Sequence, residues 1–273
     1  MNSPSSNGAM IRSPAAGPAP VLMALTTPST MSLPSQAWPA GSAAPTLRRV
    51  SFVLAPGETL AVVGTSGSGK STLARLLVGA WQPHAGKIRL DNADINMWNR
   101  QELGPYLGYL SQDVELFEGT VAENIARFGE LDSLKIVDAA RRAGVHDMIL
   151  GLPQGYETRL GPGAGALSGG QRQRIGLARA MYGNPVLVVL DEPNSNLDSA
   201  GEEALADAIW QMKRSGTTVV LISHRSKVLR QADHMLMLKD GAATFLEAWH
   251  RQLGIRAPAG GSTAVLPRRV AGA

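Results

Sequence analysis

A glycine-rich stretch near residue 65 has the residue types and the spacing of a phosphate-binding loop. Residues 64–72 fit the pattern G-x-x-x-x-G-K-[ST], and they stand between an apolar run that predicts a strand and a segment that predicts a helix. Glycines let successive backbone N–H groups point at phosphate oxygens, and the helix N-terminus adds positive potential. The sequence therefore predicts a nucleoside triphosphate site formed by Gly64, Thr65, Ser66, Gly67, Ser68, Gly69, Lys70, Ser71 and Thr72.

Four side chains within and beyond this loop are predicted to act on the bound nucleotide. Lys70 is placed to reach the β- and γ-phosphates, and Ser71 is placed to hold Mg²⁺. Asp191 follows the apolar run of residues 187–190, where a carboxylate beside the phosphate loop would hold the same metal. Glu192 comes next and points elsewhere, so we predict that it accepts the proton of an attacking water, which typically contributes about 10²–10⁴-fold in rate.

Two polar residues that follow other predicted strands extend this set. Gln112 comes after the strand predicted over residues 107–111, and its neutral amide is suited to bind Mg²⁺ or the lytic water. His224 comes shortly after the strand predicted over residues 217–222, where an imidazole is placed to contact the γ-phosphate and orient the base. We therefore predict Glu192, His224 and Gln112 as catalytic residues, and Ser71, Gln112 and Asp191 as metal ligands.

A second anion-binding sequence opens the helix predicted over residues 169–182. Ser168 is a good N-cap, and Gly169 and Gly170 leave backbone N–H groups exposed at the start of that helix. The residues predicted to contact phosphate here are Ser168, Gly169, Gly170 and Gln171. Because residues 64–72 already cradle one triphosphate, two cradles per chain predict that two chains grip each ATP in a head-to-tail dimer.

The elements that must position these residues read as an α/β domain. The unbroken apolar strands at residues 186–190 and 219–222 are typical of a parallel sheet that helices cover on both faces. Helical patterns dominate over about residues 113–183, which predicts a helical subdomain inserted between two sheet strands. Strands are predicted over residues 50–55, 59–64, 86–91, 107–111, 185–190, 217–222 and 235–238, and helices over residues 70–78, 134–143, 169–182, 200–214 and 226–231.

Composition divides the chain into three parts. Residues 1–45 are rich in Pro, Ser, Ala and Thr with almost no charge, so they are predicted to form a mostly disordered linker. The folded domain is predicted over residues 46–247, and residues 248–273 are predicted to form a flexible tail.

No run of 18 or more apolar residues occurs, so we expect no transmembrane segment in this chain. The absence of cysteine excludes disulfides and thiolate metal sites.

These motifs, in this order, resemble the nucleotide-binding domain of ATP-binding-cassette (ABC) transporters over roughly residues 45–247. The resemblance rests on the phosphate loop, Gln112, residues 167–171, Asp191 with Glu192, residues 195–198 and His224. It implies a P-loop NTPase core, with a mostly parallel sheet, flanking helices and a small antiparallel β part, that binds and hydrolyses ATP with Mg²⁺ as a dimer. It also implies that Asp198 lies at the seam between the two chains, that Trp38 stacks on adenine, and that the helical subdomain docks on a membrane domain.

Three segments resemble one branch of this family, the exporters. Residues 111–125 and 152–158 are similar to the exporter form of these segments, and residues 192–198 resemble type I secretion ATPases of the protease and lipase exporter group. In that group membrane helices precede the ATPase in one polypeptide, which works with a periplasmic adaptor and an outer-membrane channel. The resemblance therefore implies protein export driven from the cytoplasmic face of a bacterial inner membrane, with a transmembrane permease domain as partner.

The sequence departs from the family pattern in several places. No membrane domain is found in this chain, so transport requires a partner chain or this is a detached domain. The first strand of the fold is expected near residues 30–38, but Pro34 interrupts that segment. Pro162 stands where exporters usually carry an acid that helps couple the ATPase to its membrane domain, and the ending after Gly241 is also unusual.

Two other functions are compatible with parts of the sequence. Soluble cassette ATPases that act on nucleic acid or ribosomes usually carry two cassettes per chain, and one is found here. The net charge of +4 is also scattered rather than gathered in a basic stripe, so no nucleic-acid partner is expected. A truncated exporter remnant would bind nucleotide without productive coupling. The complete catalytic set argues against lost ATPase activity, whereas the missing membrane domain and the poor first strand argue for lost transport.

Overall fold

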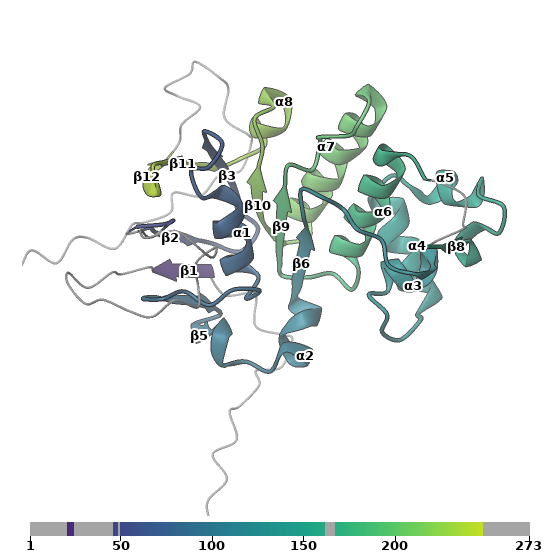
Figure 1. The fold of residues 1–273 in the computed structure, drawn as a ribbon, viewed down its shortest axis with the longest axis horizontal. Helices are drawn as coiled ribbons and strands as arrows, with labels where there is room; N and C mark the ends of the chain where they lie inside the picture. The colour runs from purple at the N-terminus through teal and green to yellow at the C-terminus, as the bar shows by residue number, and fades with distance from the viewer. Residues whose placement is uncertain (1–20, 25–45, 49, 162–166, 248–273) are drawn as a thin grey trace, which may run out of the picture.

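The computed structural model describes residues 21–24, 46–48, 50–161 and 167–247, and it has a mixed α/β architecture built around one large sheet (Figure 1). In spatial order its strands are β12 (Ala242–Glu247), β11 (His234–Lys239), β3 (Thr59–Gly64), β10 (Thr218–Ile222), β9 (Leu187–Asp191) and β6 (Leu107–Leu110). The strands from β11 to β6 run parallel, and β12 pairs antiparallel with β11 at one edge. The predicted fold class is confirmed.

Strands β9 and β10, which are neighbours inside the large sheet, are buried along their whole length, which explains their unbroken apolar sequences. Alternate residues of β9 face opposite sides of the sheet, so Val188 and Val189 belong to different apolar clusters. The cluster of Val188 is completed by α6 (Gly169–Met181) and α7 (Ser199–Arg214), and that of Val189 by α1 (Lys70–Leu77). Helices therefore cover both faces of the large sheet, as the sequence predicts.

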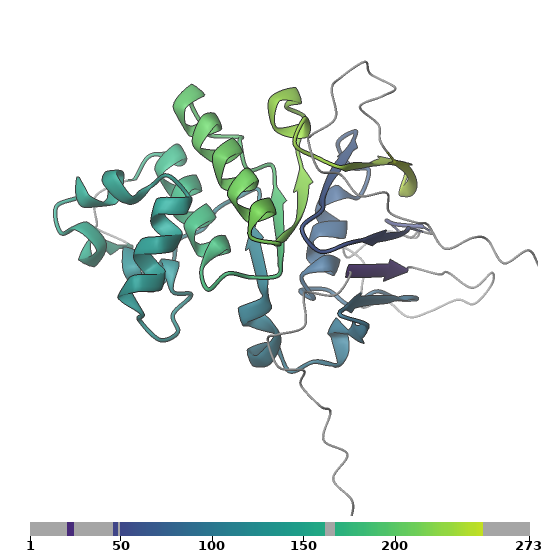
Figure 2. The ribbon, with the colours of Figure 1, turned by 180° about the vertical axis from the view of Figure 1, so that it is seen from behind.

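A smaller antiparallel sheet lies at one end of the molecule, and the helical subdomain lies at the other end (Figures 1 and 2). In spatial order the strands of the smaller sheet are β2 (Ser51–Leu54), β1 (Val21–Ala24), β4 (Lys87–Leu90) and β5 (Ala93–Asp94). Buried side chains of β2 and β4 join the same apolar cluster as α1. The small sheet is therefore part of the core that supports the start of α1.

Strand β1 corrects our prediction for the N-terminal segment. We predicted a linker over residues 1–45 with the first strand near residues 30–38, but Val21–Ala24 forms a strand. Its backbone pairs on one edge with β2 and on the other with β4, so even a short segment gains main-chain hydrogen bonds on both sides. Residues 30–38, including Trp38, and residues 248–273 lie outside the described residues.

Between β6 and β9 the chain forms the helical subdomain. Its helices are α3 (Val121–Ile125), α4 (Ser133–Arg142), α5 (His146–Leu150) and α6, and the short strand β7 (Gly119–Thr120) pairs with β8 (Arg159–Leu160) beside them. Capping side chains define where two of these helices begin. Thr120 forms a capping box with Glu123 at α3, and the Asp132 carboxylate accepts two backbone N–H groups at the start of α4.

Short elements complete the described part of the chain. They are η1 (Ile95–Met97), α2 (Arg100–Leu103), η2 (Gly104–Tyr106), η3 (Gly155–Glu157) and α8 (Ser226–Leu229). Each predicted helix begins and ends within two residues of an observed one, whereas α2, α3, α5 and the shortest strands were not predicted. Elements of two to five residues are too short to show a clear apolar period. Within the described ranges, every helix is too short or too polar to cross a membrane.

Candidate functional site

The parallel strands bring the predicted site residues to one edge of the large sheet. Strand β9 pairs in register with both β6 and β10, and β10 also pairs with β3. The carboxyl ends of parallel strands meet at the same edge, so the loops that leave these strands start side by side. Gln112 lies shortly after β6, Asp191 ends β9, and Glu192 follows it. His224 lies shortly after β10, and the phosphate loop follows β3.

The phosphate loop folds around the side chain of Lys70. Lys70 Nζ donates hydrogen bonds to the carbonyl oxygens of Gly64 and Thr65, at 2.9 and 3.0 Å. Gly64 permits a close approach of the main chain, because a Cβ atom there would lie 2.3 Å from the carbonyl oxygen of Leu238. Gly69, the N-cap of α1, has a φ of 101°, a conformation that glycine adopts readily. The ammonium of Lys70 and the N-terminus of α1 thus serve the same loop, as a phosphate site requires.

Asp191 and Ser71 meet beside this loop and fit a divalent cation. Asp191 is 2% exposed, and its Oδ1 atom is buried without a hydrogen-bond partner among the described residues. Burial raises the pKa of Asp191, while a hydrogen bond with Ser71 and the positive charges of Arg75 and Lys70 act to lower it. A buried carboxylate oxygen without a partner is costly, and a bound cation would satisfy it.

The kind of cation follows from how few protein ligands are present. The described residues contain no group of three or more His, Cys, Asp or Glu side chains that could hold a metal. Mg²⁺ usually keeps several waters and is bound by few carboxylates together with substrate phosphates. Ser71 and Asp191 therefore fit Mg²⁺ shared with a bound triphosphate better than a metal held by protein alone.

Glu192 and His224 are in direct contact. His224 Nε2 lies 3.1 Å from Glu192 Oε1. Glu192 has a φ of 49°, which is uncommon for a residue with a side chain, and its backbone N–H donates to the carbonyl oxygen of Ile222 at 2.9 Å. Burial raises the pKa of Glu192, the interactions with His224 and Lys70 lower it, and the Asp191 carboxylate raises it. A carboxylate with a raised pKa accepts a proton more readily, so Glu192 suits a general base.

A buried hydrogen bond joins the two loops that carry this pair. Ser223 Oγ donates to Asn194 Oδ1 at 2.9 Å, and both residues are buried. On the exposed side, Arg225 forms an ion pair with Glu202 of α7. Sequence reasoning missed these supports, although Asn194 and Ser223 lie next to the predicted motifs, because nothing in their residue types indicates that they face each other.

The predicted second cradle is a capped helix start, separate from residues 64–72. Ser168 is exposed and forms a capping box with Gln171: the Ser168 N–H donates to Gln171 Oε1 at 2.8 Å, and the Gln171 N–H donates to Ser168 Oγ at 3.2 Å. A Cβ atom at Gly170 would lie 2.8 Å from the carbonyl oxygen of Asn196, so glycine allows this close approach. Among the described residues, no hydrogen bond or ion pair links this cradle with residues 64–72.

The remaining predicted residues lie apart from these contacts. Gln112 is exposed at the sheet edge described above. Asp198 is also exposed, and its carboxylate caps α7 by accepting the Gly201 N–H at 2.8 Å. Trp38 and Pro162 lie outside the described residues. The structure therefore brings together Lys70, Ser71, Asp191, Glu192 and His224, and it leaves Gln112, Asp198 and the second cradle exposed around them.

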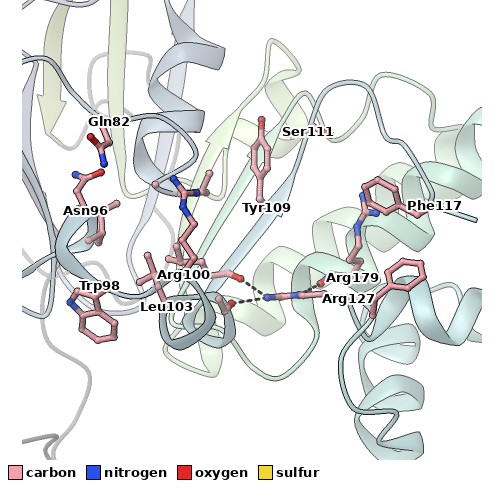
Figure 3. Close-up of a pocket in the computed structure, with 16 residues that line it drawn as sticks. Gln82, Asn96, Trp98, Arg100, Leu103, Tyr109, Ser111, Phe117, Arg127 and Arg179 are labelled. Carbon is pink, nitrogen blue, oxygen red and sulfur yellow. Dashed lines mark hydrogen bonds between the residues drawn. The ribbon is translucent and has the colours of Figure 1, made fainter. Parts of the chain in front are cut away.

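A groove of about 460 Å³ lies between the core and the helical subdomain, and residues 64–72 do not line it (Figure 3). Its walls include Trp98, Tyr109, Phe117 and Arg179. Arg127, also in the lining, points its guanidinium at main-chain carbonyl oxygens of η2, β6 and the end of α6. Burial lowers the pKa of Arg127 to about 10, so it remains charged at neutral pH and holds the two parts of the molecule together.

Known proteins are similar in sequence to most of this chain. The family profile described as ABC transporter matches residues 47–195. The type I secretion system ATP-binding protein PrsD of Rhizobium meliloti (strain 1021) is 51% identical over 193 residues, which is 70% of this chain and 33% of that protein. The ATP-dependent lipid A-core flippase of Saccharophagus degradans is 41% identical over 198 residues, which is 72% of this chain and 34% of that protein.

A solved structure is similar over most of the chain. The structure of a bacterial Atm1-family ABC exporter with ATP bound matches with a TM-score of 0.71 and 31% sequence identity, over 85% of this chain and 40% of that chain. This chain spans about a third of the length of the curated relatives described above.

Proposed function

Because the chain belongs to the ABC transporter family, whose ATP-binding domains are ATPases, we propose that it binds and hydrolyses ATP to drive export. The match also confirms the family resemblance predicted from the sequence. The observation that carries the proposal is the 3.1 Å contact between Glu192 and His224, at the sheet edge that also carries Asp191 with its buried unpaired oxygen.

In this proposal the phosphate loop binds and neutralises the substrate. The backbone N–H groups of residues 64–72 and the Lys70 ammonium contact the β- and γ-phosphates of ATP. Ser71, Asp191 and Gln112 would hold Mg²⁺, which would neutralise charge on the phosphates. These residues orient the γ-phosphate toward the loops that follow β9 and β10.

Hydrolysis then depends on the pair at the end of β9 and β10. Glu192 accepts a proton from a water while the water oxygen attacks the γ-phosphorus. The bond from the γ-phosphorus to the bridging oxygen breaks, so ADP and inorganic phosphate leave. His224 holds the Glu192 carboxylate in place and contacts the γ-phosphate. In this proposal, two side chains that lie 3.1 Å apart direct the water toward the γ-phosphate.

The second cradle supports a dimer with ATP at both seams. Its donors at Ser168, Gly169 and Gly170 make no contact with this chain's own phosphate loop among the described residues, which is what a site completed by a second chain requires. Asp198 lies on the exposed side of the neighbouring segment, in line with the seam position that the family resemblance implies. A Glu192→Gln chain with saturating Mg-ATP is expected to elute as a dimer in sizing experiments, and a monomer would contradict the proposal.

The membrane partner follows from the exporter relatives. We propose that the chain works at the cytoplasmic face of a bacterial inner membrane with a transmembrane permease domain, in type I protein secretion with a periplasmic adaptor and an outer-membrane channel. PrsD is named as a type I secretion system ATP-binding protein, and we place the docking of the permease at the groove lined by Trp98 and Phe117. Co-purification from detergent-solubilised membranes should recover an integral exporter subunit. Recovery of the chain without any membrane protein would contradict this part of the proposal.

A single substitution tests the catalytic assignment. Glu192→Gln removes the base but keeps the shape of the side chain, so it should lower kcat by about 10²–10⁴-fold and leave ATP binding intact. Glu203→Gln is the matched control, because Glu203 is exposed on α7 and pairs with Lys227. Hydrolysis near the wild-type rate in Glu192→Gln would remove Glu192 from the role of base.

A further inference from the structure

Gln173 is a buried polar side chain that the proposed mechanism does not use. It lies on α6, three residues beyond Gly170 of the second cradle, and is 2% exposed. A buried amide needs hydrogen-bond partners, and its position on the inward face of α6, four residues before the buried Leu177, limits where those partners can be. The hydrogen bonds of the Gln173 amide all go to the segment that follows Asp191.

Both ends of the Gln173 amide are engaged. Its Nε2 donates to the main-chain carbonyl oxygen of Glu192 at 3.2 Å. Its Oε1 accepts hydrogen bonds from Asn196 Nδ2 at 3.2 Å and from Ser195 Oγ at 3.4 Å. One side chain of α6 therefore holds the start and the middle of the segment between β9 and α7.

The bond to Glu192 matters because the backbone of Glu192 is in an unusual conformation. With a φ of 49°, Glu192 depends on its surroundings to keep this turn. Its N–H is held by Ile222, and its carbonyl oxygen is held by the Ser195 N–H at 3.2 Å and by Gln173. These bonds hold the main chain from which the Glu192 side chain extends, so a displacement of this main chain would move the carboxylate relative to His224. Misplacing a reacting group by about 1 Å can cost about 10²-fold in rate.

We propose that Gln173 is a positioning residue for ATP hydrolysis, which ties α6 and its cradle to the main chain of Glu192. The inference rests on the proposed role of Glu192. In the proposed dimer, α6 presents the cradle to the ATP of the partner chain, while Gln173 on the same helix holds the base for the chain's own ATP. A shift of α6 therefore changes the position of the Glu192 carboxylate relative to the chain's own ATP.

Two substitutions at Gln173 separate its contacts. Gln173→Met has similar length and removes both the donor and the acceptor, whereas Gln173→Glu keeps an acceptor but loses the donor to Glu192. We expect each variant to lower kcat by about 10-fold, the size of one lost hydrogen bond to a buried group, with KM for ATP unchanged. The fold should survive in both variants, because Ser195 and Asn196 are exposed and can bond to water instead.

Gln231→Met is the matched control. Gln231 also donates a side-chain hydrogen bond to a main-chain carbonyl oxygen, that of Ala206 at 3.0 Å, but it lies near the start of β11 and does not contact the segment after β9. The same chemical change there should leave kcat at the wild-type value. Thermal unfolding of every variant, measured without nucleotide, checks that the assays compare folded proteins.

The results distinguish the inference from the proposed function. Wild-type kcat in Gln173→Met and Gln173→Glu, an effect confined to KM, or an equal loss in Gln231→Met would overturn the positioning role. If Glu192→Gln itself keeps hydrolysing ATP, the proposed base fails regardless of Gln173. Loss of activity in Glu192→Gln together with full activity in both Gln173 variants rejects the inference alone.

Discussion

The chain has two helix starts that offer glycine backbone to phosphate, and they differ in what surrounds them. At α1, the Lys70 ammonium donates hydrogen bonds to carbonyl oxygens of the loop. Asp191, at the end of β9, lies close enough for the charge of Lys70 to act on its pKa. At α6, the side chains of Ser168 and Gln171 bond to each other's backbone. The first is a site with ionised groups from two elements. The second is a neutral cap made by Ser168 and Gln171, and Arg174 of the same helix donates to the Gly170 carbonyl oxygen at 3.5 Å.

This difference indicates that the two cradles would contribute differently to ATP binding and hydrolysis. The charged site has what binding and cleaving a triphosphate require: a cation, a metal site and a nearby base. The neutral cap lacks a base of its own, but its donors can still contact phosphate brought by another chain. Substitutions at the first cradle should therefore affect ATP binding by the single chain, while those at the second should leave that binding unchanged and weaken the dimer.

The largest effect is expected for Lys70→Met. Two or more charge-assisted hydrogen bonds to phosphate are lost, each worth about 1.5–3 kcal/mol, so the Kd of the monomer for ATP should rise by about 100-fold or more. Isothermal titration of the monomer measures this value. Lys87→Met, an exposed lysine of β4, serves as control and should bind like the wild type. Tight ATP binding by Lys70→Met would show that the charge at the first cradle is not what distinguishes it.

A smaller and different effect is expected for Ser168→Ala. Loss of the N-cap should lower the free energy of unfolding by about 1 kcal/mol and leave ATP binding by the monomer unchanged. In the Glu192→Gln background, the dimer with Mg-ATP should weaken by about 10-fold, because one hydrogen bond to phosphate is lost. Sedimentation across protein concentrations measures the dimer constant.

Asp132→Ala provides the capping control for this test. The Asp132 carboxylate caps α4, away from either cradle, so its loss should cost similar stability without weakening the dimer. An equal weakening of the dimer by Asp132→Ala and Ser168→Ala would mean that stability, rather than phosphate contact, explains the effect. The two cradles would then not differ as described above.

The smallest effect is expected for Asp198, which separates capping from a role at the seam. Asp198→Ala removes the cap of α7 and should lower the free energy of unfolding by about 1 kcal/mol in urea denaturation. Asp198→Asn keeps an equally good cap, so its stability should equal that of the wild type. Slower hydrolysis by a stable Asp198→Asn dimer would indicate that the charge acts at the seam. Full activity would limit Asp198 to capping.

Elements and site residues with a local sequence pattern were predicted, whereas those that depend on contacts between distant parts of the chain were not. The longer helices and the parallel strands were predicted because they show a clear apolar period or an unbroken apolar run over five residues or more. Strand β1 was missed because four residues form a strand only between two partners that come later in the chain. Strand β12, at the unusual ending after Gly241, likewise depends on its pairing with β11.

The site residues also fall into two groups, those predicted from local motifs and those missed because their partners are distant in the chain. Lys70, Ser71, Asp191, Glu192 and His224 were predicted from motifs at fixed spacing, and the structure brings them together at one sheet edge. Gln173, Asn194, Ser223 and Arg127 were missed, although each holds part of the site or of its surroundings. Their partners are 15 or more residues away along the chain, so no local pattern reveals them.

The sequence by itself determined the chemistry of this protein, because phosphate binding, metal binding and base catalysis each require particular residue types at short spacing. Tertiary structure alone decided how those residues act on one another. It placed His224 against Glu192, buried one oxygen of Asp191 without a partner among the described residues, and linked Glu192 to α6 through Gln173. The physical reason is that hydrogen bonds and burial depend on which strands and helices become neighbours, and that is set by the packing of the whole domain.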